Sequence, residues 1–286
     1  MLVRKVLVPL SGAAAEGPVI VTAMTVARTF GAQTVGLFVR ADPTEALPYL
    51  GDGVSGQVIE DLLRAAKESS DRASASARAM FAEAAAKVGV PLASKGGGVE
   101  LPSARFLDVT GHRDDIVAAH SRLSDIVIFG EGNVGVAGGS TLEAAMMNAG
   151  RPVLIAPQAA ALEIGGSVAI GWDESAEAAH AVTAAIPFLE RAKKVTIFRI
   201  GGKEPDPAST AMLADYLALH GIDADARLVD AQGRPVGEVL LEQCEKTGAD
   251  FLVVGGYGHS RLREYIIGGA TQHIRSHATI PVLMAH

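Results

Sequence analysis

The stretch Asp250-Phe251-Leu252-Val253-Val254-Gly255 occurs twice in this chain in nearly the same form, first as Asp125-Ile126-Val127-Ile128-Phe129-Gly130. In both places four apolar residues separate an aspartate from a glycine, a length typical of a buried strand. Each stretch is followed by a second apolar run, Pro152-Val153-Leu154-Ile155-Ala156 and Pro281-Val282-Leu283-Met284-Ala285. Two pairs of matching runs in the same order indicate an internal duplication.

The duplication extends back to the start of each copy. Each copy begins with a short apolar run, continues with an Ala/Val-rich amphipathic stretch and returns to an apolar run. These segments are 5–11, 18–30 and 34–39 in the first copy and 167–173, 176–191 and 194–198 in the second. Short strands that alternate with helices indicate βαβ units and a parallel sheet. We therefore predict an α/β chain of two tandem open parallel-sheet, Rossmann-like domains, 1–158 and 166–286.

Composition excludes several other classes of protein. The chain has 286 residues, 49% of them hydrophobic, which is enough to bury a core in each copy. Its net charge is −7 and it has no long basic run, which argues against a nucleic-acid partner. No apolar stretch approaches the roughly 20 residues that span a bilayer, so we expect no membrane partner and a cytoplasmic location. The single cysteine, Cys244, shares helical spacing with apolar neighbours and is expected in the core.

The two copies differ in length at two places. The first copy has a longer middle section, 42–101, with a long Ala- and charge-rich helix expected at 58–88, whereas the second has a short one expected at 208–220. The first copy is shorter near its end, because 27 positions separate Asp125 from Pro152 and 31 separate Asp250 from Pro281. These four residues are missing where a ligand loop is expected.

Ligands of open parallel sheets bind beyond the carboxyl ends of the strands. In the second copy the loop at this position begins at Gly255, and it contains Gly258, Gly268 and Gly269 before a helix expected at 270–276. Glycines allow backbone to approach a ligand closely, and a helix N-terminus attracts phosphate. Thr271 would add a hydroxyl group to that phosphate site.

This loop resembles the nucleotide loop of the universal stress protein family. The shared pattern is a strand, Gly-x-x-Gly, nine residues, and then Gly followed by a small residue, with Asp173 at the end of the first strand of the copy. The resemblance covers nearly the whole chain as two family domains. It implies five-stranded parallel sheets, binding of ATP or AMP in some members, little or no catalysis, and a role in stress adaptation. It also implies that the two copies pack about an internal pseudo-two-fold, with the Pro-Val-Leu strands at the contact.

Site residues follow from the resemblance position by position. Asp173 and Ile200 would flank the adenine and ribose, and Val254, Gly255 and Gly258 would form the loop. The phosphate cradle would consist of Gly268, Gly269, Ala270 and Thr271. The sequence departs from the family at Gly269, where a serine or threonine is usual, and this removes a hydroxyl group from the phosphate end. The alternative interpretation is that the glycines only permit tight packing of strand against helix.

The first copy is interpreted as a lost site with a structural role. Ser11 stands at the position of Asp173, and the shortened loop carries Glu131, whose negative charge opposes a phosphate. A small anion site at Gly139-Ser140-Thr141, before the next helix, stays open. No G-x-x-x-x-G-K-[ST] motif supports a P-loop enzyme. His273 and His277 could share a helix face, but without acidic or cysteine partners nearby a metal site is not expected.

The leading hypothesis is a stress-response protein that binds ATP or AMP, with or without Mg²⁺, in its C-terminal copy and acts by binding rather than catalysis. The alternative is a ligand-free interaction protein of the same fold. An enzyme ranks last, although weak ATP hydrolysis stays open. The expected partners are an adenine nucleotide and an unidentified protein. The chain is expected to form a pseudo-dimer within itself, with homodimer formation left open.

Overall fold

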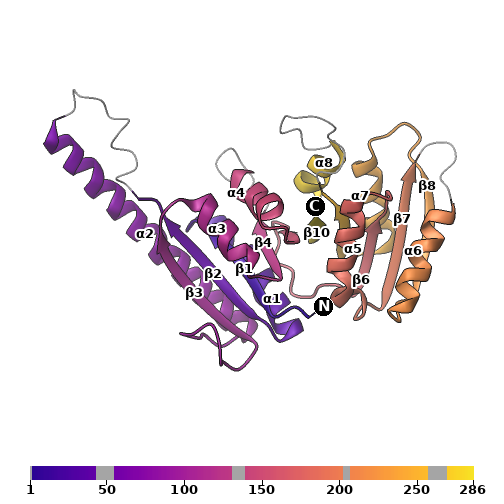
Figure 1. The fold of residues 1–286 in the computed structure, drawn as a ribbon, viewed down its shortest axis with the longest axis horizontal. Helices are drawn as coiled ribbons and strands as arrows, with labels where there is room; N and C mark the ends of the chain where they lie inside the picture. Colours follow the sequence, from indigo (N-terminus) through magenta and orange to yellow (C-terminus); the bar gives the residue numbers. More distant parts are fainter. Residues whose placement is uncertain (1, 43–54, 131–138, 202–206, 257–268) are drawn as a thin grey trace.

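The computed structural model describes residues 2–42, 55–130, 139–201, 207–256 and 269–286, and these form two successive series of strands and helices (Figure 1). The N-terminal half contains β1 (Lys5–Leu10), α1 (Gly17–Phe30), β2 (Gln33–Arg40), α2 (Gly56–Val88), β3 (Ser103–Thr110), α3 (Arg113–Arg122), β4 (Ile126–Gly130), α4 (Gly139–Glu143) with a π-helical turn (Ala144–Asn148), and β5 (Val153–Ala156). The C-terminal half contains β6 (Ser167–Gly171), α5 (Ala176–Leu189), β7 (Lys194–Gly201), α6 (Pro207–Leu219), β8 (Ala224–Asp230), α7 (Val236–Thr247), β9 (Phe251–Gly255), α8 (Gly269–His277) and β10 (Val282–Ala285).

Within each half, five strands pair in parallel in the same order. The described residues form one ten-stranded sheet with the order β3-β2-β1-β4-β5-β10-β9-β6-β7-β8. The second half of this order repeats the first in reverse, because β6 to β10 correspond to β1 to β5. The strands pair in parallel because helices connect successive strands. Each helix returns the chain to the end of the sheet at which the previous strand began. The predicted fold class is confirmed.

The two halves meet at an antiparallel pair of strands. Leu154 of β5 lies opposite Leu283 of β10, and these two leucines occupy equivalent positions in the two copies. On either side of this pair, Val153 lies opposite Met284 and Ile155 lies opposite Val282. This exchange of equivalent positions defines a pseudo-two-fold axis between the leucines. The sequence analysis expects two sheets about such an axis, and the structure joins the two along their edges into one sheet.

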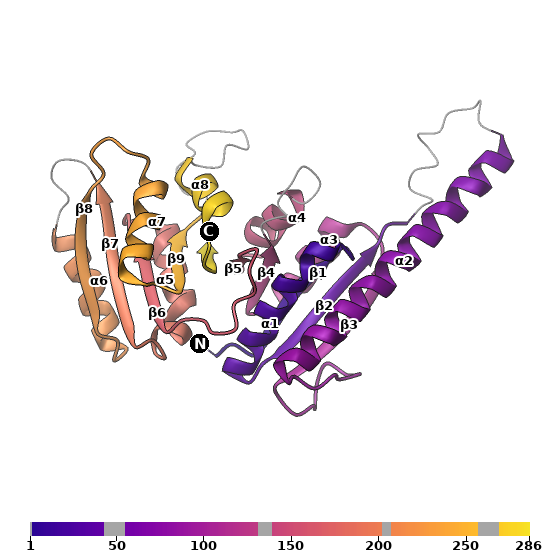
Figure 2. The ribbon, with the colours of Figure 1, turned by 180° about the vertical axis from the view of Figure 1, so that it is seen from behind.

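Two apolar layers cover the faces of this sheet. Buried side chains of α1, α2, α5 and α6 form one layer, and those of α3, α7 and α8 with the π-helical turn form the other. Each layer runs across the junction between the halves. In the first layer Phe30 of α1 meets Phe188 of α5 edge to face, with ring centroids 4.7 Å apart. The view from behind shows α1 and α2 over the N-terminal half of the sheet (Figure 2).

An aspartate holds the start of each copy in place. The Asp125 carboxylate accepts hydrogen bonds from the Arg4 and Lys5 amides at 2.8 and 2.9 Å. The Asp250 carboxylate accepts three, from the amides of residues 165–167 at 3.0 to 3.2 Å. Each aspartate thereby ties the amino end of the first strand to the start of the fourth, which explains the repeated Asp in the duplicated stretch.

Helix ends agree closely with the predicted ranges. The long helix expected at 58–88 is Gly56–Val88, with the Ser55 hydroxyl accepting from the Val58 amide and Gly89 ending the helix at a φ of 76°. Left-handed backbone of this kind favours glycine, so Gly89 indicates in the sequence where the helix ends. The helices expected at 208–220 and 270–276 are Pro207–Leu219 and Gly269–His277. Within the described part of the chain, no helix is both long and apolar enough to cross a membrane.

Replacing Asp250 tests the tie at the start of the C-terminal half. We expect Asp250→Ala to lower the free energy of unfolding by about 2–3 kcal/mol, because three backbone donors lose a charged acceptor. Urea denaturation followed by circular dichroism measures the change. Asp223→Ala, at an exposed position with the same chemistry, is the control. An equal loss of stability in both variants would contradict the assigned role.

Candidate functional site

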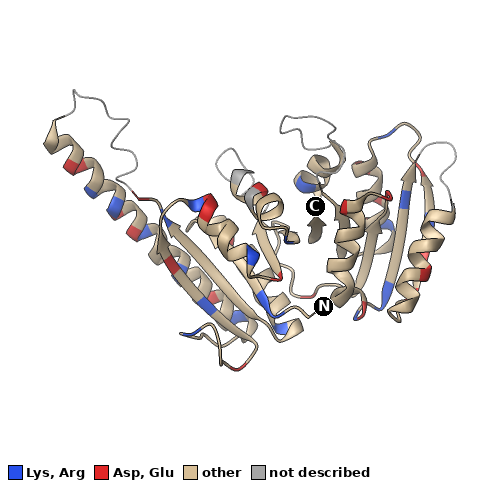
Figure 3. Ribbon diagram, viewed as in Figure 1, with Lys and Arg blue, Asp and Glu red and all other residues tan. Residues whose placement is uncertain are grey.

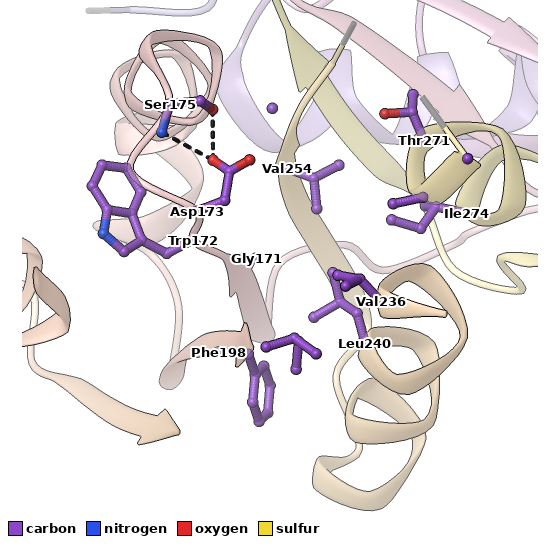
Figure 4. A pocket seen from close by; sticks show the side chains of 14 residues that line it. Gly171, Trp172, Asp173, Ser175, Phe198, Val236, Leu240, Val254, Thr271 and Ile274 are labelled. Atoms are coloured by element: carbon purple, nitrogen blue, oxygen red, sulfur yellow. Dashed lines mark hydrogen bonds between the residues drawn. The ribbon is translucent and has the colours of Figure 1, made fainter. Parts of the chain in front are cut away.

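A cavity of about 200 Å³ opens at the carboxyl ends of three neighbouring strands in the C-terminal half. Its floor is formed by the ends of β6, β7 and β9, and its sides by the first turns of α5, α7 and α8. The close-up shows Asp173 and Thr271 on opposite sides of the cavity, with Val254 between them (Figure 4). The site therefore lies where open parallel sheets bind their ligands.

Most of the residues that the sequence singles out come together in this cavity. Its lining includes Asp173, Ile200, Val254, Gly255, Gly269, Ala270 and Thr271. The two remaining predicted residues, Gly258 and Gly268, lie outside the described residues. Residues almost a hundred positions apart in the chain are thus brought to one place by β6, β9 and α8.

Asp173 is held by the turn that leads into α5. Its Oδ1 atom accepts a hydrogen bond from the Ser175 amide at 3.0 Å and another from the Ser175 hydroxyl at 2.5 Å. Ser175 is also the N-cap of α5, because its hydroxyl accepts from the Ala178 amide at 3.1 Å. The carboxylate is therefore fixed at the edge of the cavity (Figure 4). Ser175 was not predicted, although Asp-x-Ser before a helix is a recognisable turn and cap signal.

The walls of the cavity are apolar, and most of them were not predicted. Phe198 and Ile200 alternate along β7 and so face the same side of the sheet. Val236 and Leu240 are one turn apart on α7, and Ile274 of α8 completes the wall. Strand and helix periodicity show that such residues share a face, but not that the face borders a cavity. Val236 is 44% exposed, which is high for an apolar residue and places it at the mouth.

The glycines at positions 255 and 269 of the cavity are explained by different physical causes. A Cβ atom on Gly255 would lie 2.7 Å from the Ala178 nitrogen, so glycine is required there for β9 to pack against α5. At this residue the packing interpretation is sufficient. Among the described residues, no atom would lie within 4 Å of a Cβ atom on Gly269, so their packing does not explain that glycine. Gly269 begins α8, where the first backbone N–H groups lack partners within the helix.

Comparison with known proteins gives the C-terminal half a family. Residues 166–286 match the model of the universal stress protein family. The C-terminal half is a universal stress protein domain. A comparison of the sequence with curated proteins finds no match.

Solved structures of universal stress proteins share the fold of the entire chain. A universal stress protein from Archaeoglobus fulgidus superposes with a TM-score of 0.66 at 14% identity, covering 98% of this chain and 97% of that one. A putative universal stress protein from Pseudomonas aeruginosa has a TM-score of 0.55 at 16% identity, covering 98% and 92%. The tandem layout of two universal stress protein folds agrees with these neighbours.

The N-terminal universal stress protein fold has a different cluster at the equivalent position. Glu16 is buried, and its carboxylate accepts from the Ser11 amide at 2.8 Å, the Ser11 hydroxyl at 2.7 Å and the Gly12 amide at 3.0 Å. Ser11 is the counterpart of Asp173. The protein's own carboxylate therefore takes the donors of this turn, which supports the interpretation of a lost site.

Arg113 completes this cluster. It is the first residue of α3, as Val236 is the first residue of α7, and its Nη1 donates to the Leu10 carbonyl at 3.0 Å. Burial lowers the pKa of the Arg113 guanidinium, while the nearby Glu16 carboxylate acts in the opposite direction. An arginine thus stands where the C-terminal half has an apolar cavity wall. Sequence reasoning missed both residues, because neither belongs to a motif.

The anion site left open in the N-terminal half is also occupied by protein groups. The Thr141 hydroxyl donates to Asp114 Oδ1 at 2.6 Å, so it already has an acceptor, and the acceptor is a carboxylate that would repel an anion. The predicted contribution of Glu131, at the start of the shortened loop, lies outside the described residues.

Other candidate residues have structural explanations. His273 and His277 stack on one face of α8 with ring centroids 4.2 Å apart, and His277 Nδ1 contacts the His273 carbonyl at 2.9 Å. Among the described residues no group of three or more His, Cys, Asp or Glu side chains could hold a metal ion. Cys244 is buried as predicted, and burial raises the pKa of its thiol to about 12, which keeps it protonated and unreactive.

Glu16 provides a test of the lost site. We expect Glu16→Ala to lower the free energy of unfolding by about 3 kcal/mol, because the Ser11 and Gly12 donors lose their acceptor and the half-buried Arg113 loses a nearby negative charge. Urea denaturation measures the change, and Glu163→Ala, at an exposed position, serves as the control. A variant as stable as the parent would show that the cluster contributes nothing to the N-terminal half.

Proposed function

We propose that the C-terminal half binds an adenine nucleotide, ATP or AMP, with or without Mg²⁺, in the cavity beside Asp173. The chain then acts in stress adaptation by binding rather than by catalysis. The observation that carries this proposal is the combination in one cavity of a fixed carboxylate, apolar walls and the start of α8. Each of these features suits one part of a nucleotide.

The apolar part of the cavity suits the base. A flat purine gains free energy by leaving water for the space between Ile200 on β7 and Val236 and Leu240 on α7. Asp173 is an acceptor for ribose hydroxyls or the exocyclic amino group of adenine, and hydrogen bonds to a charged group are the stronger kind. The described α8 presents its N-terminus, with Gly269, Ala270 and Thr271, toward the phosphate end.

The same lining supports binding without turnover. Among the described residues of the cavity, Asp173 alone has a titratable side chain. General acid–base catalysis needs a positioned group that accepts a proton from the attacking water and a stabiliser for developing charge. The Asp173 carboxylate already accepts hydrogen bonds from Ser175. The described lining has no second carboxylate that could act as an acid or as a further metal ligand. His259, the histidine within the glycine loop, lies outside the described residues.

A ligand-free interaction protein is the second candidate. It is favoured by Gly255. Packing of α5 against this residue leaves no room for a Cβ atom, so the glycine is explained without any nucleotide. In that case the cavity is a by-product of packing β9 against the helices. The two candidates differ in one measurable quantity, the nucleotide that accompanies the purified protein.

Mass spectrometry of small molecules released on denaturation separates the two candidates. Nucleotide binding predicts adenine nucleotide in the released fraction, and titration calorimetry of emptied protein then gives one site per chain for ATP or AMP. GTP is the matched control, because only its base differs. Release of no nucleotide, together with no heat of binding for ATP or AMP, would establish the ligand-free alternative.

Asp173 provides the first residue test. We expect Asp173→Asn to weaken nucleotide binding by about 1.5–3 kcal/mol, because it removes the charge while Oδ1 can still accept from Ser175. The matched control is Ser11→Ala at the equivalent position of the N-terminal half, which should leave affinity unchanged. Calorimetry measures affinity, and thermal melts show that both variants fold. If only Ser11→Ala weakened binding, the nucleotide site would lie in the N-terminal half and the proposal would be wrong.

Gly269 provides a gain-of-function test. No atom of the described residues would lie within 4 Å of a Cβ atom there, so Gly269→Ser fits among them and restores the hydroxyl group that the family pattern contains. We expect about 0.5–1.5 kcal/mol tighter binding of ATP from one added hydrogen bond to phosphate. Gly269→Ala is the control, because it adds the same Cβ atom without the hydroxyl group. Equal affinities for the two variants would show that phosphate does not reach this end of α8.

A further inference from the structure

The N-terminal half of α2 extends beyond the rest of the domain. In Figure 1 this helix runs past the edge of the sheet at the left of the molecule. None of the residues 55–72 is buried, whereas Ser74, Ala77, Phe81 and Ala84 further along the helix are. Residues 56–70 therefore form a projection of about 22 Å, at 1.5 Å per residue. C-terminal α6, its counterpart, has only 13 residues.

The last anchor of α2 to the sheet lies at the base of this projection. Arg40 of β2 donates to Asp108 of β3 at 2.7 Å and to Asp71 of α2 at 2.5 Å, and the Ser74 hydroxyl donates to Asp108 at 2.5 Å. The hydrogen bond from Arg40 holds the pKa of the Asp108 carboxyl below its usual value. This network fixes the direction of the helix.

The projection is amphipathic. Val58, Ile59, Leu62, Leu63 and Ala66, which we call the free stripe, lie on one side of the helix at 100° per residue. Val58 is 47% and Leu62 is 48% exposed. The charged residues of the projection lie within an arc of about 120° on the other side. The free stripe continues the line of Ala77 and Phe81, which bury the remainder of α2, so the pattern that packs the helix in the domain persists where the domain has ended.

Such a helix needs a partner for stability. Isolated helices of about 15 residues are marginal in water, and apolar side chains exposed along one side add to the cost. Figure 3 shows both acidic and basic residues along the projection. The arrangement of these charges indicates which partner fits.

One edge of the free stripe carries opposite charges two turns apart. Glu60 and Lys67 are separated by seven residues and therefore lie in line on the same edge. A second projection that lies antiparallel brings its Lys67 against Glu60 and its Glu60 against Lys67. A parallel pair related by a two-fold axis along the helices would turn this edge toward the opposite edge of the second helix, so Glu60 and Lys67 of the two copies would not meet. The projection is thus complementary to itself in the antiparallel direction.

The remaining residues agree with this pairing. In the antiparallel register Leu62 and Leu63 of both helices meet at the centre, and Ile59 packs beside Ala66 of the second copy. The small Ala66 permits close approach of the helices. The body of each chain lies beyond the tip of the other helix, so the contact is isologous and closes at two chains.

We propose that the free stripe is a homodimer interface, in which the projecting parts of α2 from two chains pair antiparallel. This interface is separate from the β5–β10 junction, which joins the two halves within one chain. It is also independent of the nucleotide site, so the proposed function and this interface can fail separately.

Sedimentation velocity of the full chain over a wide concentration range tests the proposal. We expect a monomer–dimer equilibrium whose dissociation constant rises about tenfold or more in Leu62→Glu, because a charge replaces a buried apolar contact in both helices. Leu219→Glu, at a leucine that is 87% exposed at the end of α6, is the matched control and should leave the equilibrium unchanged. Circular dichroism and thermal melts show that each variant folds.

Charge exchange tests the direction of pairing. Glu60→Lys and Lys67→Glu should each weaken the dimer by about fivefold, because each creates like-charge contacts at both ends. The double variant should return to the parent dissociation constant, since it restores opposite charges in the antiparallel register. A chain that is monomeric at every concentration would overturn the proposal. So would a dimer that Leu62→Glu leaves intact, or a double variant no stronger than the single ones.

Discussion

The antiparallel pairing of β5 with β10 is the constraint on which the rest of this structure depends. Without it each five-stranded half would end in an exposed strand with unpaired N–H and C=O groups. Leu154 and Leu283, at the centre of the junction, are fully buried, and both apolar layers continue across it. The junction thus completes two cores at once, and neither half has a finished core alone.

The junction also reaches the candidate nucleotide site. β10 pairs with β9, and the Gly256 amide donates to the Ala285 carbonyl at 2.8 Å, directly where the glycine loop begins. From the other half, Met146 packs against the same residue, since a Cβ atom on Gly256 would lie 2.8 Å from its Cε. The N-terminal half therefore contacts Gly256, the last described residue before the loop of the C-terminal half.

Sequence reasoning succeeds here where a signal is local or repeated. Buried strands such as β4 and β9 are continuous apolar runs, and duplication shows them twice. β8 is harder to recognise, because most of its residues are exposed and its pattern does not alternate clearly. Other features depend on contacts between residues about a hundred positions apart. They are the pairing of the two halves into one sheet and the cluster of Glu16 with Arg113. The lining of the cavity was predictable at Asp173, Gly255 and Gly269, which belong to a motif, and not at Phe198 or Val236, which become walls only after folding.

The connector between β5 and β6 makes the two copies parts of one gene product. In a dimer of identical subunits every substitution appears twice, so a change that fills one cavity fills the other. Here Ser11 and Asp173, or Arg113 and Val236, can differ because each position is inherited separately. Because the two copies are fused, selection can act on each position of one copy without changing the equivalent position of the other. One copy can keep a cavity while the other acquires a cluster of charged residues around the buried Glu16, and the chain always contains one of each.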